Sequence, residues 1–198
     1  MQPQLVFGIS VLMGLVVWGT IAARDIWPAL RRRPRAQALR PLLLLHAFRF
    51  VGLAFLVPGV VSPDLPGGFA RPAAYGDLAT SILALLAIAT SRSRPGTIVV
   101  WVFNIVGTVD LLNAFYQGNR LGVGIAPGLQ GAAYFIPTVV VPLLLVTHVL
   151  VFCILLRRDA AVGQRDGVGG AEGRRVPRLR RFLPAGMYEY GVRRTFSI

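Results

Sequence analysis

Seven polar side chains interrupt the long apolar stretches of this 198-residue chain. Ionisable and amide groups are costly to bury among apolar residues, so they mark candidate sites for ion pairing, proton transfer or ligand binding. The predicted intramembrane polar site consists of His46, Arg49, Asn104, Thr108, Asp110, Asn113 and His148. Counted at 1.5 Å per residue from the more basic ends of the stretches, these residues lie at depths of about 8 to 24 Å.

The stretch WVFNIVGTVDLLNAFYQ, residues 101–117, holds four of the seven polar residues. Rotation by about 100° per residue places Asn113 nearly opposite Asn104, so this helix is polar on two sides and is expected to lie centrally. The first hypothesis is an ion pair between Arg49 and Asp110, because each charge offsets the desolvation of the other.

Three functional interpretations, besides a purely structural role in fixing helix register, fit this polar layer. In the favoured one, the layer binds a small polar solute or relays protons in a transporter, channel-like protein or ligand sensor. Asp110 is then the proton-binding or cation-binding group, Arg49 its counter-charge, and the histidines the pH-sensitive members. In the second, His46 and His148 are axial ligands of a b-type haem or bind a metal in an enzyme or redox subunit. In the third, the chain is an accessory or assembly subunit.

The composition indicates an all-α, polytopic membrane helix bundle. Hydrophobic residues make up 55% of the chain and charged residues 15%, and the mean hydropathy is +0.63. Five apolar stretches are long enough to be considered as transmembrane helices. Their predicted bounds are 5–27, 41–61, 75–91, 97–116 and 132–156. The third is the shortest, with Asp77 near its start and a predicted Pro/Gly-rich loop, 62–76, before it. Its length leaves a buried or re-entrant segment open as the alternative to a full crossing.

Local sequence features predict how two of these helices pack. Pro137 and Pro142 should kink the last one and leave backbone carbonyls near Ala133 and Thr138 that need a partner from a neighbouring helix, a hydroxyl or an ordered water.

The first helix contains small residues at a spacing of four. Ser10 and Gly14, and then Gly19 and Ala23, offer a face on which another helix can approach closely.

The arginines predict the topology. All 21 basic residues are Arg, and segments 24–40, 92–94 and 157–198 hold six, two and ten of them. The positive-inside rule therefore predicts a cell-membrane protein with its N-terminus outside and its C-terminus cytoplasmic. The tail, 157–198, is predicted to be disordered or to lie on anionic lipid headgroups, with no nucleic-acid partner. A homo-oligomer or a protein partner stays open.

The sequence contains none of the common motifs of hydrolases, nucleotide-binding proteins or zinc proteases. The chain contains no G-x-S-x-G, G-x-x-x-x-G-K, H-E-x-x-H or CxxC pattern, and its single cysteine, Cys153, lies in an apolar run. Hydrolase, nucleotide-binding and zinc-protease functions are therefore not indicated, no catalytic residue is assigned, and the favoured interpretation needs no cofactor. In general character the chain looks like small membrane proteins of GC-rich bacteria.

Overall fold

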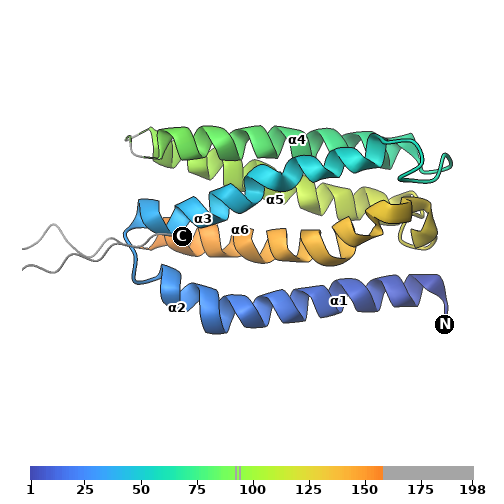
Figure 1. Cartoon of the computed structure of the whole chain (residues 1–198), viewed down its shortest axis with the longest axis horizontal. Coiled ribbons are helices and arrows are strands. Elements are labelled where there is room, and N and C mark those ends of the chain that lie inside the picture. Colours follow the sequence, from blue (N-terminus) through green and yellow to red (C-terminus); the bar gives the residue numbers. More distant parts are fainter. Residues whose placement is uncertain (92, 94, 158–198) are drawn as a thin grey trace, which may run out of the picture. The chain divides into compact units, whose positions relative to one another are not determined.

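The computed structural model describes residues 1–91, 93 and 95–157, and within them it is helical, as the sequence predicted. The only strand-like pairing in this part of the chain is an isolated bridge between Pro58 and Val61. The helical elements, shown in Figure 1, are α1 (Pro3–Ile21), the π-helix η1 (Ala22–Ile26), α2 (Trp27–Leu30), α3 (Arg35–Ala47), the 3-10 helix η2 (Phe48–Leu56), α4 (Gly67–Thr90), α5 (Gly96–Arg120), the 3-10 helix η3 (Pro127–Tyr134), the π-helix η4 (Ile136–Val140) and α6 (Val141–Leu156).

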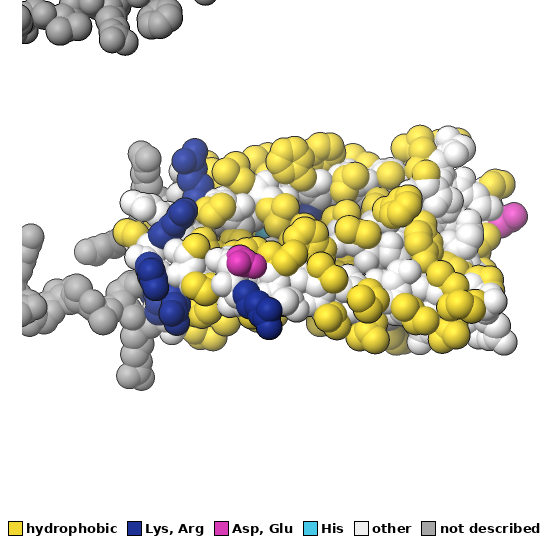
Figure 2. Space-filling view, turned by 60° about the horizontal axis from the view of Figure 1, so that its bottom comes forward, with side chains coloured by type: hydrophobic (Ala, Val, Ile, Leu, Met, Phe, Trp, Pro, Cys, Tyr) yellow, Lys and Arg dark blue, Asp and Glu magenta, His cyan; other side chains and the backbone are white. Residues whose placement is uncertain are grey.

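Five helical runs are long and apolar enough to cross a membrane, which is the number predicted from the sequence. They are Pro3–Leu30, Arg35–Leu56, Gly67–Thr90, Gly96–Arg120 and Ile136–Leu156. Large apolar side chains such as Leu12, Leu85 and Val109 are exposed on their outer faces, and Figure 2 shows apolar side chains along the length of the molecule.

Helix α4 begins well before its predicted start, at Gly67, and includes most of the predicted loop. Pro72 lies inside it, where the proline removes one N–H near the start of the helix. Phe69, Ala70 and Ala73 are buried there, so apolar packing outweighs the turn-forming composition. Asp77 therefore lies near the end of the third turn of α4 and not at its first residue.

The second run also differs from its prediction, since it begins at Arg35 and contains Pro41 in its interior. At Phe48 the α-helix tightens to the 3-10 helix η2. Side chains three residues apart are eclipsed in a 3-10 helix, and the buried residues of η2 are Arg49, Gly52 and Phe55. The tighter winding thus aligns the arginine, the glycine and the phenylalanine in one inward-facing row.

Helix α1 packs against the proline-containing region before α6. The indole nitrogen of Trp18 donates to the Val139 carbonyl at 3.2 Å, so a neighbouring helix supplies a donor to this segment, although not to the carbonyls of Ala133 or Thr138 that the sequence predicted to need one. A β-carbon at Gly14 would lie 2.6 Å from the Thr138 carbonyl oxygen, which confirms the close approach expected at this glycine. A β-carbon at Gly19 would meet nothing within 4 Å, so the same prediction is wrong there.

Basic residues of distant segments meet at one end of the bundle. The Arg157 guanidinium donates to the carbonyls of Arg31 at 2.8 Å and Arg33 at 3.0 Å. Figure 2 shows the arginines gathered near this end. The prediction for the tail falls, beyond Arg157, outside the described residues.

Candidate functional site

A buried arginine joins two carboxylates at the centre of the bundle. Arg49, from η2, is 1% exposed. Its Nε donates to Asp77 Oδ1 of α4 at 2.7 Å, and its Nη2 donates to Asp110 Oδ2 of α5 at 2.7 Å. Nη2 also lies 2.7 Å from Asp77 Oδ1. The predicted Arg49–Asp110 contact is therefore present, and Asp77 is a second carboxylate that the sequence analysis did not include.

The third guanidinium nitrogen connects this ion cluster to α6. Arg49 Nη1 lies 3.2 Å from the Gly107 carbonyl and 3.2 Å from His148 Nε2. A guanidinium only donates, so His148 Nε2 accepts, and the ring proton is on Nδ1. That nitrogen lies 2.7 Å from Asn104 Oδ1, which accepts the hydrogen bond. All three nitrogens of Arg49 are thus engaged, and His148 is a neutral imidazole of defined tautomer.

His46 lies next to His148, but its Nε2 donates a hydrogen bond whereas the Nε2 of His148 accepts one. Its Nε2 lies 3.0 Å from Thr147 Oγ1, and that hydroxyl lies 2.9 Å from the Leu143 carbonyl and 3.0 Å from the Leu144 carbonyl. With its single proton directed at these carbonyls, the hydroxyl accepts from His46 Nε2–H. His46 Nδ1 is buried without a hydrogen-bond partner.

We expect nitrogen NMR of the histidine-labelled protein to show two neutral imidazoles of opposite tautomer. His148 should carry its proton on Nδ1 because Arg49 occupies the other nitrogen, whereas His46 should carry its proton on Nε2. The chain has two histidines, so the pair of spectra needs no further labelling. An Arg49→Met variant should release the constraint on His148 alone. Two histidines of the same tautomer in the parent protein would contradict the hydrogen-bond assignment.

The histidine pair does not fit the haem interpretation. The ring centroids of His46 and His148 are 4.1 Å apart, so the rings pack against each other and leave no space for a porphyrin between them. Both Nε2 atoms are also engaged, with Thr147 and with Arg49. Within the described residues, no group of three or more His, Cys, Asp or Glu side chains is placed to hold a metal ion.

Three glycines make room for the charged and aromatic members of the cluster. A β-carbon at Gly52 would collide with the Asp77 carboxylate, and one at Gly76 would collide with the Asp110 carboxylate. A β-carbon at Gly107 would lie 2.6 Å from the His148 ring. Each of these polar side chains therefore fits against bare backbone of a neighbouring helix, which lets α4 and α5 approach η2 and α6 closely.

The structure does not bring all the predicted polar residues together. Thr108 donates to the Asn104 carbonyl of its own helix at 2.7 Å, and Asn113 lies on the exposed face of α5. Asp77 was not predicted to join the cluster, because the Pro/Gly-rich segment before it has the composition of a loop. The shortness of the predicted third helix was the only signal in the sequence that this helix begins earlier.

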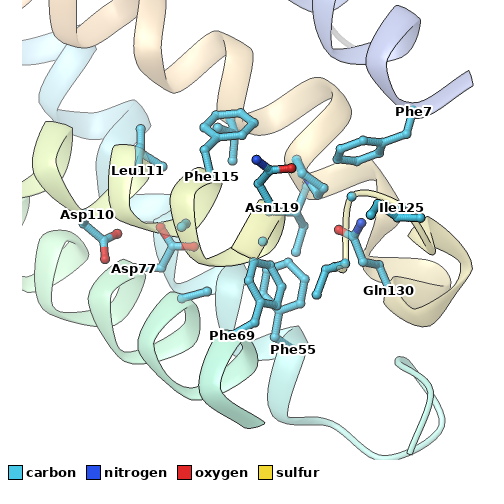
Figure 3. A pocket seen from close by; sticks show the side chains of 18 of the residues that line it. Phe7, Phe55, Phe69, Asp77, Asp110, Leu111, Phe115, Asn119, Ile125 and Gln130 are labelled. Atoms are coloured by element: carbon cyan, nitrogen blue, oxygen red, sulfur yellow. The ribbon is translucent and has the colours of Figure 1, made fainter. Parts of the chain in front are cut away.

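A cavity of about 530 Å³ extends from the two carboxylates toward the N-terminal end of α1 (Figure 3). Its middle is lined by aromatic and aliphatic side chains, among them Phe55, Phe69, Leu111 and Phe115. Gln130 of η3 lines the far end and is 1% exposed, and neither its amide oxygen nor its amide nitrogen has a hydrogen-bond partner. The cavity is thus apolar in the middle and polar at both ends.

Comparisons with known proteins identify the family without indicating an activity. Neither the curated proteins nor the solved structures include a match to the chain. Residues 6–156, which contain every element of the bundle that lines the cluster, match the family described as Domain of unknown function (DUF8737). The chain therefore belongs to the DUF8737 family.

Proposed function

We propose that this chain is a multi-pass membrane protein that binds a small solute within the bilayer, in the cavity that ends at Asp77 and Asp110. The observation that carries the proposal is the cavity itself. An ion cluster that only fixed helix register would need no space beside it, whereas about 530 Å³ is the size of a small-molecule site.

The proposed orientation follows from the charges at the two ends of the bundle. The arginine-rich end, with Arg31, Arg33 and Arg157, is assigned to the cytoplasm of a cell-membrane protein. The cavity runs toward the opposite end, where Gln4 and Phe7 of α1 line it. In this orientation the solute enters from the outer side and reaches the carboxylates near the middle of the membrane.

The charge of the cluster makes the proposed binding proton-linked. Arg49 contacts Asp77 and Asp110, so one positive charge faces two carboxylates. An uncompensated negative charge in apolar surroundings is costly, and a proton or a positive group of the solute would neutralise it. A transporter or ligand sensor fits this arrangement; an accessory subunit remains the alternative, and co-purification of one stoichiometric partner would favour it.

A cavity-filling variant tests the proposal. Ala114 lines the cavity, so an Ala114→Phe substitution should occupy part of it, while Ala89→Phe places the same ring on an exposed position of α4. The purified proteins are incubated with a small-molecule extract of the cells that produced them and examined by native mass spectrometry. We expect a bound species on the parent protein and on Ala89→Phe that is reduced at least about tenfold on Ala114→Phe. Absence of any bound species on the parent, or equal binding by Ala114→Phe, would refute solute binding.

A further inference from the structure

We infer that the solute is an organic monocation with an apolar body and a hydrogen-bonding group at its far end. This inference rests on the proposed function and specifies its ligand. The cationic group, an ammonium, lies against Asp77 and Asp110, the body lies between the aromatic side chains, and the far group meets Gln130. Three features of the cavity lead to this chemistry.

The polar end of the cavity presents negative and not positive groups. Asp77 and Asp110 line the cavity, whereas Arg49 lies behind them with a fully buried side chain. All three of its nitrogens are engaged by the carboxylates, the Gly107 carbonyl or His148. A carboxylate or phosphate ligand would find no free guanidinium donor and no positive charge to pair with the carboxyl groups of Asp77 and Asp110, so an anion is disfavoured.

The middle of the cavity is suited to an apolar body. The rings of Phe55 and Phe69 stand edge to face with centroids 5.4 Å apart, and Leu111 and Phe115 come from α5 on the other side (Figure 3). Asp110 and Asn119 both line the cavity from α5, and at 1.5 Å per residue they are separated by about 13 Å along the helix. The wall that α5 contributes to the cavity is therefore about as long as a ten-carbon chain, which sets the length chosen for the probes.

The far end contains a buried amide that requires a partner. Gln130 has two unpartnered polar atoms, and a buried polar group left without a hydrogen bond destabilises the folded protein. The backbone around it is fixed on both sides, because Ser62 N donates to the Leu129 carbonyl at 3.0 Å and Ala132 N donates to the Val60 carbonyl at 2.9 Å. The amide is thus held at the cavity by its backbone while its own hydrogen-bonding groups are unused.

Binding of such a cation should release one proton. The charged and titratable groups around the carboxylates are Arg49 from η2, Asp77 from α4, Asp110 from α5 and His148 from α6, and His148 is neutral because its Nε2 accepts from Arg49. One carboxylate is balanced by Arg49 and the other, in the empty cavity, by a proton. When the ammonium binds, the carboxylic O–H bond breaks, the proton leaves to solvent, and the carboxylate pairs with the ammonium.

Calorimetry on the purified full-length chain tests the ligand class with four probes of equal chain length: 10-amino-1-decanol, decylammonium, 1-decanol and decanoate. We expect the two ammonium probes to bind saturably, and decanol and decanoate at least about tenfold more weakly. Titrations in HEPES and in phosphate, which differ in ionisation enthalpy, should reveal release of about one proton per ammonium bound. Equal or tighter binding of decanoate or decanol, or no proton release, would overturn the inference.

Two variants localise the ends of the ligand. Asp110→Asn should weaken the binding of both ammonium probes at least about tenfold and abolish the release of the proton. The partition of the probes into detergent should stay the same. Gln130→Leu should leave the affinity for decylammonium unchanged but remove the tighter binding of 10-amino-1-decanol relative to decylammonium. If 10-amino-1-decanol still binds more tightly to this variant, the far end of the ligand does not lie at Gln130. This second variant keeps the test decisive if Asp110→Asn fails to fold. In the native mass spectrometry experiment, the species that is lost on Ala114→Phe identifies the charge of the solute. If that species is neutral or anionic, the inferred cation is wrong but the proposed function stands. If the parent protein shows no bound species at all, both the inference and the proposed function are wrong.

Discussion

Replacing Arg49 with methionine is expected to lower the free energy of unfolding by about 3–5 kcal/mol, the range found when one partner of a buried ion pair is removed. The guanidinium is fully buried and contacts both Asp77 and Asp110 at 2.7 Å. Methionine fills much of the same space with an unbranched apolar chain. The loss is therefore mainly electrostatic, because two carboxylates remain in the bundle without their cation.

Unfolding in mixed micelles of sodium dodecyl sulfate and a mild detergent, followed by far-ultraviolet circular dichroism, measures this effect. Arg71→Met is the matched control, since Arg71 is exposed on α4, and it should stay within about 0.5 kcal/mol of the parent. Combining Arg49→Met with Asp77→Asn and Asp110→Asn should recover part of the loss, because the uncompensated charges are then gone. If Arg49→Met unfolds like Arg71→Met, or the triple variant is no more stable than Arg49→Met, the ion cluster does not stabilise the bundle as argued.

Substituting Gly107 with alanine is expected to destabilise the protein by about 1–3 kcal/mol, although alanine is the better helix former. The added β-carbon would lie 2.6 Å from the His148 ring and 2.7 Å from Thr80. Both neighbours are buried and cannot move aside without disturbing the packing. Displacement of the His148 ring would also break its 3.2 Å contact with Arg49.

The same glycine-to-alanine change at Gly19 is the control for this prediction. Gly19 lies inside α1, and a β-carbon there meets nothing within 4 Å. We expect Gly19→Ala to be neutral or to stabilise by up to about 1 kcal/mol, in proportion to helix propensity. In the same micellar titration, Gly107→Ala should therefore be less stable than the parent protein, whereas Gly19→Ala should be at least as stable as the parent. A stabilised Gly107→Ala protein would show that the helices do not approach as closely as the structure indicates.

Variants of the cavity residues test ligand binding, whereas variants of Arg49 and Gly107 test the stability of the helix bundle. Arg49 and Gly107 lie behind the carboxylates and determine whether α4, α5 and α6 pack correctly around η2. Gln130 and Ala114 line the cavity and make none of the hydrogen bonds of the ion cluster. Variants at the two sets of positions thus separate the energetic role of the cluster from the proposed binding role of the cavity.

The amino-acid sequence by itself determined the helical fold and the number of long apolar helices. Hydropathy and length are properties of consecutive residues, so they could be evaluated without knowing how the helices pack. The Arg49–Asp110 contact could also be predicted, because depth along a regular helix follows from residue number alone. The same estimate put His46 and His148 at similar depth, and their rings are in contact.

Only the tertiary structure decided which polar residues belong to the cluster. Asp77 joins it because burial of Phe69, Ala70 and Ala73 extends α4 through a proline-containing segment that local turn preferences assign to a loop. Asn113 does not join it, since the packing of α5 directs that position outward.

The cavity and its far end likewise depend on contacts between segments distant in the sequence. The 3-10 winding of η2 aligns Arg49 with Gly52, and the two backbone bonds to Val60 and Ser62 hold the segment that carries Gln130. A sequence pattern specifies which residues are apolar and how far along a helix they lie. The direction in which each side chain faces, and the space left beside it, depend on how the neighbouring helices pack, and these properties are fixed only when all of them are in place.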